Sequence, residues 1–283
     1  MSKNFDSPNP IQTLTVGSVV SAGMRLYRSH FKNYFFIALK AYAWLLIPVY
    51  GWVKFYALSA LISRLAFGEL VNQPESVSSG ERFVNSRLWE FFITMLLMLA
   101  ISIGISLGFV VIAGLLIGIP AALIGGLQNI NPANIGIIIL ISLLVMIIAI
   151  TGILWIGTRF YLVDVPLAIE ENVNGSSTIN RSWELTKGNI GRILTISFVS
   201  VLITIPIQFV IQIITTIIQL IFTPLVNQGN IAFSIIYFVL IVGLSFAGGA
   251  LIVPFLQAVK AVIYYDLRSR REGLGLQLRD HDI

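Results

Sequence analysis

Two long stretches of this sequence contain no ionisable side chain. Neither Phe91 to Thr158 nor Ile193 to Val259 contains Lys, Arg, Asp, Glu or His. A helix that is apolar on every side is buried in a large protein or in lipid, because a helix at a water-facing surface keeps a polar face. Each stretch is more than long enough for two crossings of roughly 20 apolar residues. Each stretch therefore predicts a transmembrane helical hairpin.

Uncharged turn residues divide each stretch near its middle. The divisions are Gln128 to Pro132 and Thr223 to Asn230. Asn, Gly and Pro favour turns because they adopt or impose backbone conformations that interrupt a helix. The two stretches thus predict four transmembrane helices.

A third apolar region, residues 34–69, contains three cations and a central Pro-Val-Tyr-Gly segment. We interpret it as a compressed hairpin. Lys40 lies close enough to one end for its side chain to reach the membrane interface. If this region crossed only once, the rest of the chain would have the opposite orientation.

The expected fold is therefore all-α: a polytopic membrane helical bundle of about six transmembrane helices. These form three hairpins, at about residues 34–69, 91–158 and 193–265. A short interfacial amphipathic helix precedes each hairpin, within Leu14 to Tyr34, Glu75 to Phe92 and Ser176 to Ile193. The three units suggest a parallel repeat, although the demands of the interface alone would produce similar segments. Residues 14–272 are expected to form one domain, between a disordered tail at 1–13 and a C-terminal tail at 273–283.

Composition supports the membrane assignment. The chain is 57% hydrophobic and 11% charged, which is typical of polytopic membrane proteins. Because it has no cysteine, disulfides, thiolate metal sites and lipidated cysteines are excluded. The net charge of +5 is explained by retention of basic segments on one side of the membrane, so no nucleic-acid partner is expected.

The distribution of cations predicts the orientation. Lys54 is the only cation near one of the three predicted far-side turns. The N-terminal segment, the two polar connectors between the hairpins and the C-terminal tail contain most of the 18 Lys and Arg residues. By the positive-inside rule, both termini face the cytoplasm, and the expected location is a bacterial inner membrane.

Basic and aromatic residues of this cytoplasmic side are the first group of candidate site residues. Anionic lipid headgroups attract such cations. The alternative is that these residues only hold helix ends in the cytoplasm. The candidates for headgroup or interface contact are Arg25, Arg28, Lys32, Arg181, Trp183, Lys187, Arg192, Lys260, Arg268, Arg270 and Arg271.

The second group is a polar stripe along the fifth predicted transmembrane helix. Its candidate groove residues are Thr204, Gln208, Gln212 and Thr216. A hydrated path or a polar ligand groove would need such a stripe, but hydrogen bonds between packed helices explain it as well. We favour helix packing because the stripe contains no ionisable group. Glycines at close-packing spacing, Gly104, Gly108, Gly114 and Gly118, are likewise expected to pack inside the bundle.

Four motifs resemble a family of six-span bacterial proteins labelled as the membrane domain of glycerophosphoryl diester phosphodiesterase. They are Leu14 to Gly17 with Arg25 to Arg28, Pro48 to Trp52, Arg181 to Asn189 and Tyr264 to Gly273. Gly275 departs from the pattern, since related tails often have an acidic residue there. The resemblance implies six spans, and the similar proteins come from photosynthetic bacteria, which makes the thylakoid membrane an alternative location.

The family label does not imply an activity, because it arose from members fused to a phosphodiesterase barrel that this chain has no room for. Metal-assisted hydrolysis needs carboxylates and histidines clustered around an ion, whereas the acids here are scattered and expected to pair with surface cations. We therefore expect a non-enzymatic integral membrane protein without catalytic, cofactor or metal residues. It would act as a scaffold, assembly or lipid-interacting factor that contacts anionic lipids and a membrane-protein partner. The alternative is a small-solute transporter or export component that uses the polar stripe.

Overall fold

The computed structural model describes residues 14–123 and 132–272, and each element within these ranges is a helix. The predicted tails, Gly275 and most of the predicted turn before Pro132 lie outside the described residues. The all-α class is confirmed. In chain order the helices are α1 (Val16–Ser29), α2 (Phe31–Trp44), α3 (Tyr50–Leu70), α4 (Val77–Ser86), α5 (Leu88–Leu123), α6 (Pro132–Arg159), α7 (Asp164–Ile169), α8 (Ser177–Thr186), α9 (Ile190–Val226) and α10 (Ile231–Glu272).

Within the described residues, four segments are long and apolar enough to cross a membrane, which makes this a multi-pass membrane protein. They are Leu88–Ile119, Gly136–Ile169, Ile190–Val226 and Ile231–Glu272. Their side chains are largely exposed, as expected where lipid rather than protein surrounds a helix. A break within the predicted Thr223 to Asn230 segment is confirmed, although α9 continues through Val226 and the turn itself is Asn227 to Asn230.

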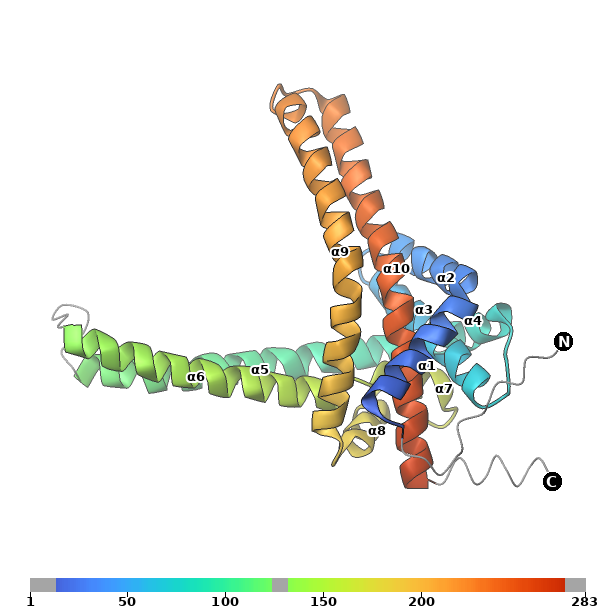
Figure 1. Ribbon diagram of the computed structural model, residues 1–283, viewed down its shortest axis with the longest axis horizontal. Coiled ribbons are helices and arrows are strands. Elements are labelled where there is room, and N and C mark those ends of the chain that lie inside the picture. Colours follow the sequence, from blue (N-terminus) through green and yellow to red (C-terminus); the bar gives the residue numbers. More distant parts are fainter. Residues whose placement is uncertain (1–13, 124–131, 273–283) are drawn as a thin grey trace.

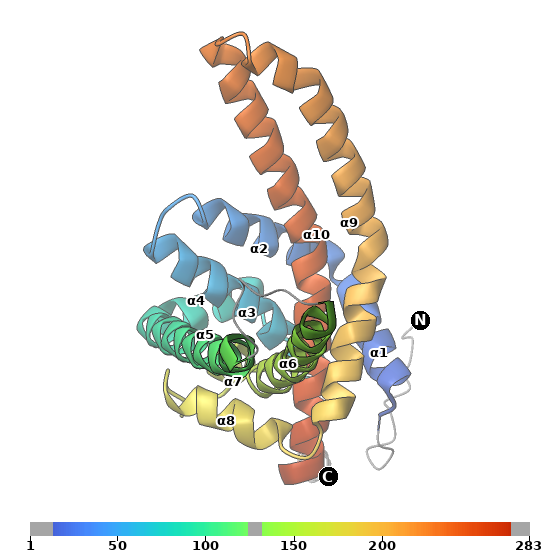
Figure 2. The same cartoon turned by 90° about the vertical axis from the view of Figure 1, so that its left-hand side faces the viewer.

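These helices form two long antiparallel hairpins, α5–α6 and α9–α10 (Figure 1). The hairpins leave a common base in different directions: α5–α6 extends to the left in Figure 1 and α9–α10 upward. Turned by 90°, α5–α6 points toward the viewer while α9–α10 still extends upward (Figure 2). We use "helical base" for α1–α4, α7 and α8 with the adjoining ends of the four long helices.

The second half of α10 is the central element of the helical base. It packs against α1, α2, α3 and α9. From Phe255 to Leu267 most of its side chains are buried, whereas most residues between Ile231 and Gly243 are exposed or half-buried. One continuous helix thus passes from the lipid-exposed hairpin into the hydrophobic core of the base.

The prediction of six transmembrane helices is wrong, because α2 and α3 are not among the membrane-crossing candidates. With 14 residues, α2 is about 21 Å long, short of the roughly 30 Å hydrocarbon layer. The 21 residues of α3 would suffice, but every residue from Ala57 to Ser63 is buried inside the helical base. Protein packing, rather than lipid, explains the apolar character of α3.

Two polar contacts hold the α2–α3 pair against α4. The Lys40 Nζ lies 2.5 Å from an oxygen of Glu81, and the Lys54 Nζ donates to Asn85 at 2.8 Å. Lys40, whose side chain we expected to reach the membrane interface, therefore has an acidic partner in Glu81. Lys54 therefore lies in the helical base, next to α4, and not at the distant end of a transmembrane hairpin.

The three predicted short amphipathic helices are confirmed as α1, α4 and α8, which precede the helix pairs α2–α3, α5–α6 and α9–α10. The hydroxyl oxygens of Thr15 and Ser76 accept the N–H of Ser18 and Ser79, both at 3.2 Å, and so cap α1 and α4.

The glycine prediction is wrong: a Cβ at Gly104, Gly108, Gly114 or Gly118 would meet no atom of the described residues within 4 Å. Close approach occurs in α1 and α10 instead. A Cβ at Gly249 would lie 2.2 Å from the Tyr42 hydroxyl, and one at Gly23 would lie 2.6 Å from a Val259 methyl. Small residues therefore serve packing around α10 and not within α5.

Candidate functional site

The polar interior of the helical base is organised around α7, a short helix between the two hairpins. Five of its six residues, Asp164 to Ala168, are buried. It contacts α3, α5, α8 and α10. Polar groups from these helices bind it at both ends.

At the start of α7, the Asp164 carboxylate binds two residues of α10. The Lys260 Nζ lies 3.0 and 2.9 Å from its two oxygens, and the Gln257 Nε2 donates to Oδ2 at 2.9 Å. Ser63 of α3 donates to the Gln257 side-chain oxygen at 2.5 Å. The side chain of Asp164 is 3% exposed and that of Lys260 19%. This ion pair is internal, whereas we expected the acids to pair at the surface.

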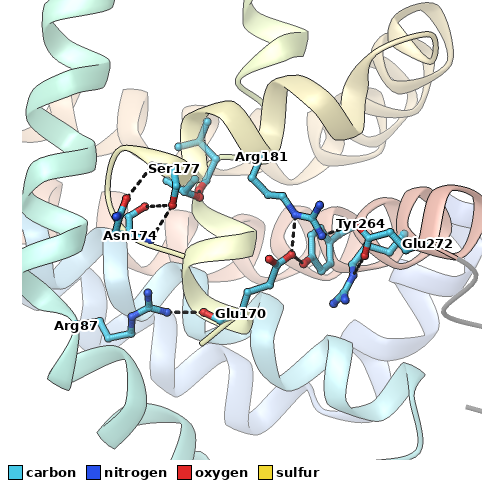
Figure 3. Close-up of polar contacts among 10 residues, drawn as sticks. Arg87, Glu170, Asn174, Ser177, Arg181, Tyr264 and Glu272 are labelled. Carbon is cyan, nitrogen blue, oxygen red and sulfur yellow. Dashed lines mark hydrogen bonds and ion pairs between the residues drawn. The ribbon is translucent and has the colours of Figure 1, made fainter. Parts of the chain in front are cut away.

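After the end of α7, the Glu170 carboxylate forms a second cluster, shown in Figure 3. Arg181 of α8 donates to it at 3.0 Å, and the Tyr264 hydroxyl also donates to it. Arg181 contacts Glu272 of α10 as well. Burial alone would lower the pKa of Arg181, but the hydrogen bonds and charges of Glu170 and Glu272 raise it above its usual value. The cluster therefore joins α7, α8 and α10 through ion pairs and a hydrogen bond.

Two arginines bind the backbone carbonyls at the end of α7. Arg87 donates to the carbonyls of Leu167 and Glu170 at 2.9 and 2.6 Å. Arg64 of α3 donates to the carbonyl of Ala168 at 2.9 Å. The last carbonyls of a helix lack hydrogen-bond donors from the same helix, and these guanidinium groups donate to them instead. Such contacts are structural and fix α7 between α3 and α5.

Most of the basic residues predicted to meet lipid have partners inside the protein. Arg192 and Arg270 both bind the Asp266 carboxylate, at 2.6 and 3.0 Å. Others bind as follows: Lys260 to Asp164, Arg181 to Glu170 and Glu272, Arg268 to Glu272, and Arg271 to the carbonyl of Lys187. These cations stabilise the helical base, which leaves them less available to headgroups.

The cations of α1 and the start of α2 are different. Arg25, Arg28 and Lys32 are exposed, and none forms an ion pair with a residue that the structure describes.

Trp183, the aromatic residue among the predicted headgroup contacts, packs against another aromatic side chain. Its ring centroid lies 5.5 Å from that of Trp155. The Arg159 guanidinium lies 4.8 Å from the ring of Trp183.

The polar stripe of α9 makes its hydrogen bonds within its own helix. Gln208 donates to the Thr204 hydroxyl at 2.9 Å, and Thr216 donates to the carbonyl of Gln212 at 2.9 Å. Thr204 is buried, whereas Gln208, Gln212 and Thr216 are exposed. Among the described residues, the expected bonds to a neighbouring helix are not formed.

Sequence reasoning missed the cluster at the start of α7, although two signals were present. Asp164 is an acid within the otherwise apolar segment from Phe160 to Ile169, where an isolated charge needs a buried partner. Gln257 and Lys260 are three residues apart and thus share one face of α10.

Comparison with family models, curated proteins and solved structures finds no match for this chain. The resemblance to the membrane domain of glycerophosphoryl diester phosphodiesterase therefore stays a prediction from four motifs.

Proposed function

We propose that this chain is a non-catalytic membrane protein that binds anionic lipid headgroups through α1 and the start of α2. It would thereby serve as a membrane scaffold or assembly factor for a membrane-protein partner. In this proposal the helical base and both termini lie on the cytoplasmic side of a bacterial inner membrane, with a thylakoid membrane as the alternative.

The observation that carries the proposal is the row of exposed cations without described acidic partners, Arg25, Arg28 and Lys32. Other predicted headgroup contacts, such as Arg192, are already neutralised by internal acids. A polybasic segment gains about 1 kcal/mol per Lys or Arg near an anionic membrane surface. Three such cations would therefore contribute roughly 3 kcal/mol, an amount that salt reduces by screening.

The position of α1 along α10 supports an interfacial role. The Tyr27 hydroxyl donates to the carbonyl of Leu251 at 2.9 Å. Leu251 is twenty residues after Ile231, which is roughly 30 Å along a helix and matches the hydrocarbon thickness. With the Asn227–Asn230 turn at the far interface, Tyr27 and the neighbouring Arg28 are at the level of the near headgroups.

The ion pairs of the helical base favour a structural role over catalysis. Asp164, Glu170 and Asp266 are each held by cationic side chains and connect helices. A transport function has less support, because the polar groups of α9 bond within that helix.

Lipid enrichment tests the proposal. The purified protein is equilibrated in mixed micelles of phosphatidylglycerol and phosphatidylcholine, and bound lipid is quantified by mass spectrometry. In the triple variant Arg25→Glu, Arg28→Glu, Lys32→Glu, we expect the enrichment of phosphatidylglycerol over phosphatidylcholine to be at least about tenfold lower than in the native protein.

Arg28→Glu alone is compared with Arg82→Glu, which reverses an exposed cation on α4. Both substitutions reverse one exposed cation, so they change the net charge equally. Only Arg28 belongs to the cationic row of α1 and α2, so we expect the larger loss of enrichment for Arg28→Glu. Enrichment that the triple variant leaves unchanged would overturn the proposal.

A further inference from the structure

A cavity of about 440 Å³ lies between α3, α5, the α6–α7 junction and α10. Its walls are apolar and include Trp52, Phe55, Met95 and Met98, while Asp164 and Lys260 form its polar end. This size falls within the range of small-molecule sites, which are mostly apolar with a few placed polar groups. Methionine adapts its shape to irregular partners, so the wall suits a flexible chain.

The polar end has no net charge, because Asp164 and Lys260 neutralise each other at 2.9 Å. Lys260 also lies 5.2 Å from the centre of the Tyr161 ring, which helps to hold its ammonium group in place. An anionic head would be repelled by Asp164, and a cationic head by Lys260. An uncharged hydroxyl head can donate to Asp164 and accept from Lys260 at the same time.

The surroundings of the cavity indicate where a ligand would come from. Along α5, beside Met95 and Met98, Leu96 and Leu99 are 45% and 54% exposed, and they belong to a membrane-crossing segment. Lipid therefore borders the apolar side of the cavity, and a hydrocarbon chain can enter from the bilayer without passing through water.

We propose that this cavity binds a membrane amphiphile of the monoacylglycerol class, with one hydrocarbon chain against Phe55, Met95 and Met98 and its uncharged, hydroxyl-bearing head at Asp164 and Lys260. This site is separate from the cationic row of α1 and does not depend on the anionic-lipid proposal.

Photolabelling in nanodiscs of phosphatidylcholine tests the site. Three probes carry the same diazirine-labelled chain and differ only in the head, which is glycerol ester, carboxylate or quaternary ammonium. The glycerol-ester probe should label peptides containing Met95, Met98 or Phe55, and unlabelled monoacylglycerol should compete. Either charged probe should label this site about tenfold less.

Met98→Trp fills the cavity and should reduce labelling by about tenfold, whereas Leu99→Trp adds the same bulk on the neighbouring exposed position and should leave it unchanged. Equal labelling by all three probes would overturn the head assignment. Labelling that Met98→Trp does not reduce would overturn the site. Reversal of the α1 cations should not change this labelling, so this result is independent of the anionic-lipid test.

Discussion

Asp164 and Lys260 form an ion pair between residues 96 positions apart, with the Lys260 Nζ at 2.9 Å from Oδ2 of the carboxylate. The contact joins the first residue of α7, which follows the α5–α6 hairpin, to the second half of α10. Asp164 is almost fully buried, so Lys260 and Gln257 replace the water that its charge would otherwise require. The two membrane hairpins are therefore connected through a charge pair inside the helical base.

Breaking this pair should destabilise the protein strongly. Lys260→Met leaves a buried carboxylate without its cation, and removing one partner of a buried pair costs about 3–5 kcal/mol. We expect a value near the lower limit, because part of the Lys260 side chain is exposed. Thermal unfolding in detergent micelles measures the effect.

The double variant Asp164→Asn, Lys260→Met removes both charges and should be more stable than Lys260→Met alone. As a control, Lys40→Ala removes an exposed pair with Glu81 and should cost no more than about 1 kcal/mol. If the losses of stability in Asp164→Asn and Lys260→Met simply added up in the double variant, the two side chains would not stabilise each other, which would contradict this prediction.

The topology of the α2–α3 pair can be tested with single cysteines, because the chain has no native cysteine. Val49→Cys lies in the α2–α3 turn, and Asn227→Cys lies in the α9–α10 turn. A membrane-impermeant maleimide added to the far side of sealed vesicles should label Asn227→Cys only. The reason is that Lys54, close to Val49 in the chain, is bound to α4 within the helical base.

Ser21→Cys on α1 serves as the marker for the near side, since Ser21 is exposed. It should react only with reagent on the side opposite to Asn227→Cys. If Val49→Cys reacted from the same side as Asn227→Cys, the α2–α3 pair would cross the membrane and the six-span arrangement would hold.

Glycine substitutions distinguish packed from lipid-facing positions. A Cβ at Gly51 would collide with the carbonyl oxygen of Trp44, whereas a Cβ at Gly104 meets no atom of the described residues within 4 Å. Gly51→Ala should therefore lower the free energy of unfolding by about 1–3 kcal/mol, as overpacking does. Gly104→Ala should not lower it. Equal effects, measured by unfolding in micelles, would argue against the tight α2–α3 turn.

The Glu75 carboxylate gives the helical base a specific sensitivity to acid. Burial raises the pKa of Glu75, but hydrogen bonds from Arg64 and Ser79, together with the charge of Arg64, outweigh burial and hold the pKa below its usual value. In the unfolded chain this carboxyl titrates near pH 4.3. Its contribution to stability is thus complete above that pH and is lost as pH falls through the lower folded value.

We therefore expect Glu75→Gln to be less stable than the native chain at neutral pH. The difference in unfolding temperature should shrink as the pH falls from about 5 to 3, because protonation of Glu75 removes the same charge. If the difference in unfolding temperature stayed constant with pH, the ionised Glu75 carboxylate would not stabilise the fold through Arg64.

The parts of the fold that the sequence predicts correctly are those where lipid determines the residues. The two uncharged stretches identify α5, α6, α9 and α10, because hydrocarbon excludes charge along a whole segment. The α2–α3 region was misassigned because protein packing selects the same apolar residues as lipid does. Nothing in the local sequence of Ala57 to Ser63 separates these two causes.

The polar contacts of the helical base were less predictable, because they join residues far apart in the chain. A basic residue such as Arg192 looks like a headgroup contact until the fold places Asp266 beside it. Arg28, by contrast, remains free of described acidic partners, so the sequence-based prediction for α1 is kept in the proposed function.

The different directions of the two hairpins lead to a last prediction (Figure 1). Each hairpin consists of helices of at least 28 residues, about 42 Å long. A flat bilayer with a hydrocarbon layer of about 30 Å accommodates both only if they run more nearly side by side. Spin labels at Leu116→Cys on α5 and Leu220→Cys on α9 should therefore report a shorter distance in lipid nanodiscs than in detergent micelles, measured by double electron–electron resonance.

A label pair within one hairpin, Leu220→Cys and Ile235→Cys, should give the same distance in both environments. An unchanged long distance between α5 and α9 would mean that the two hairpins do not cross one bilayer together.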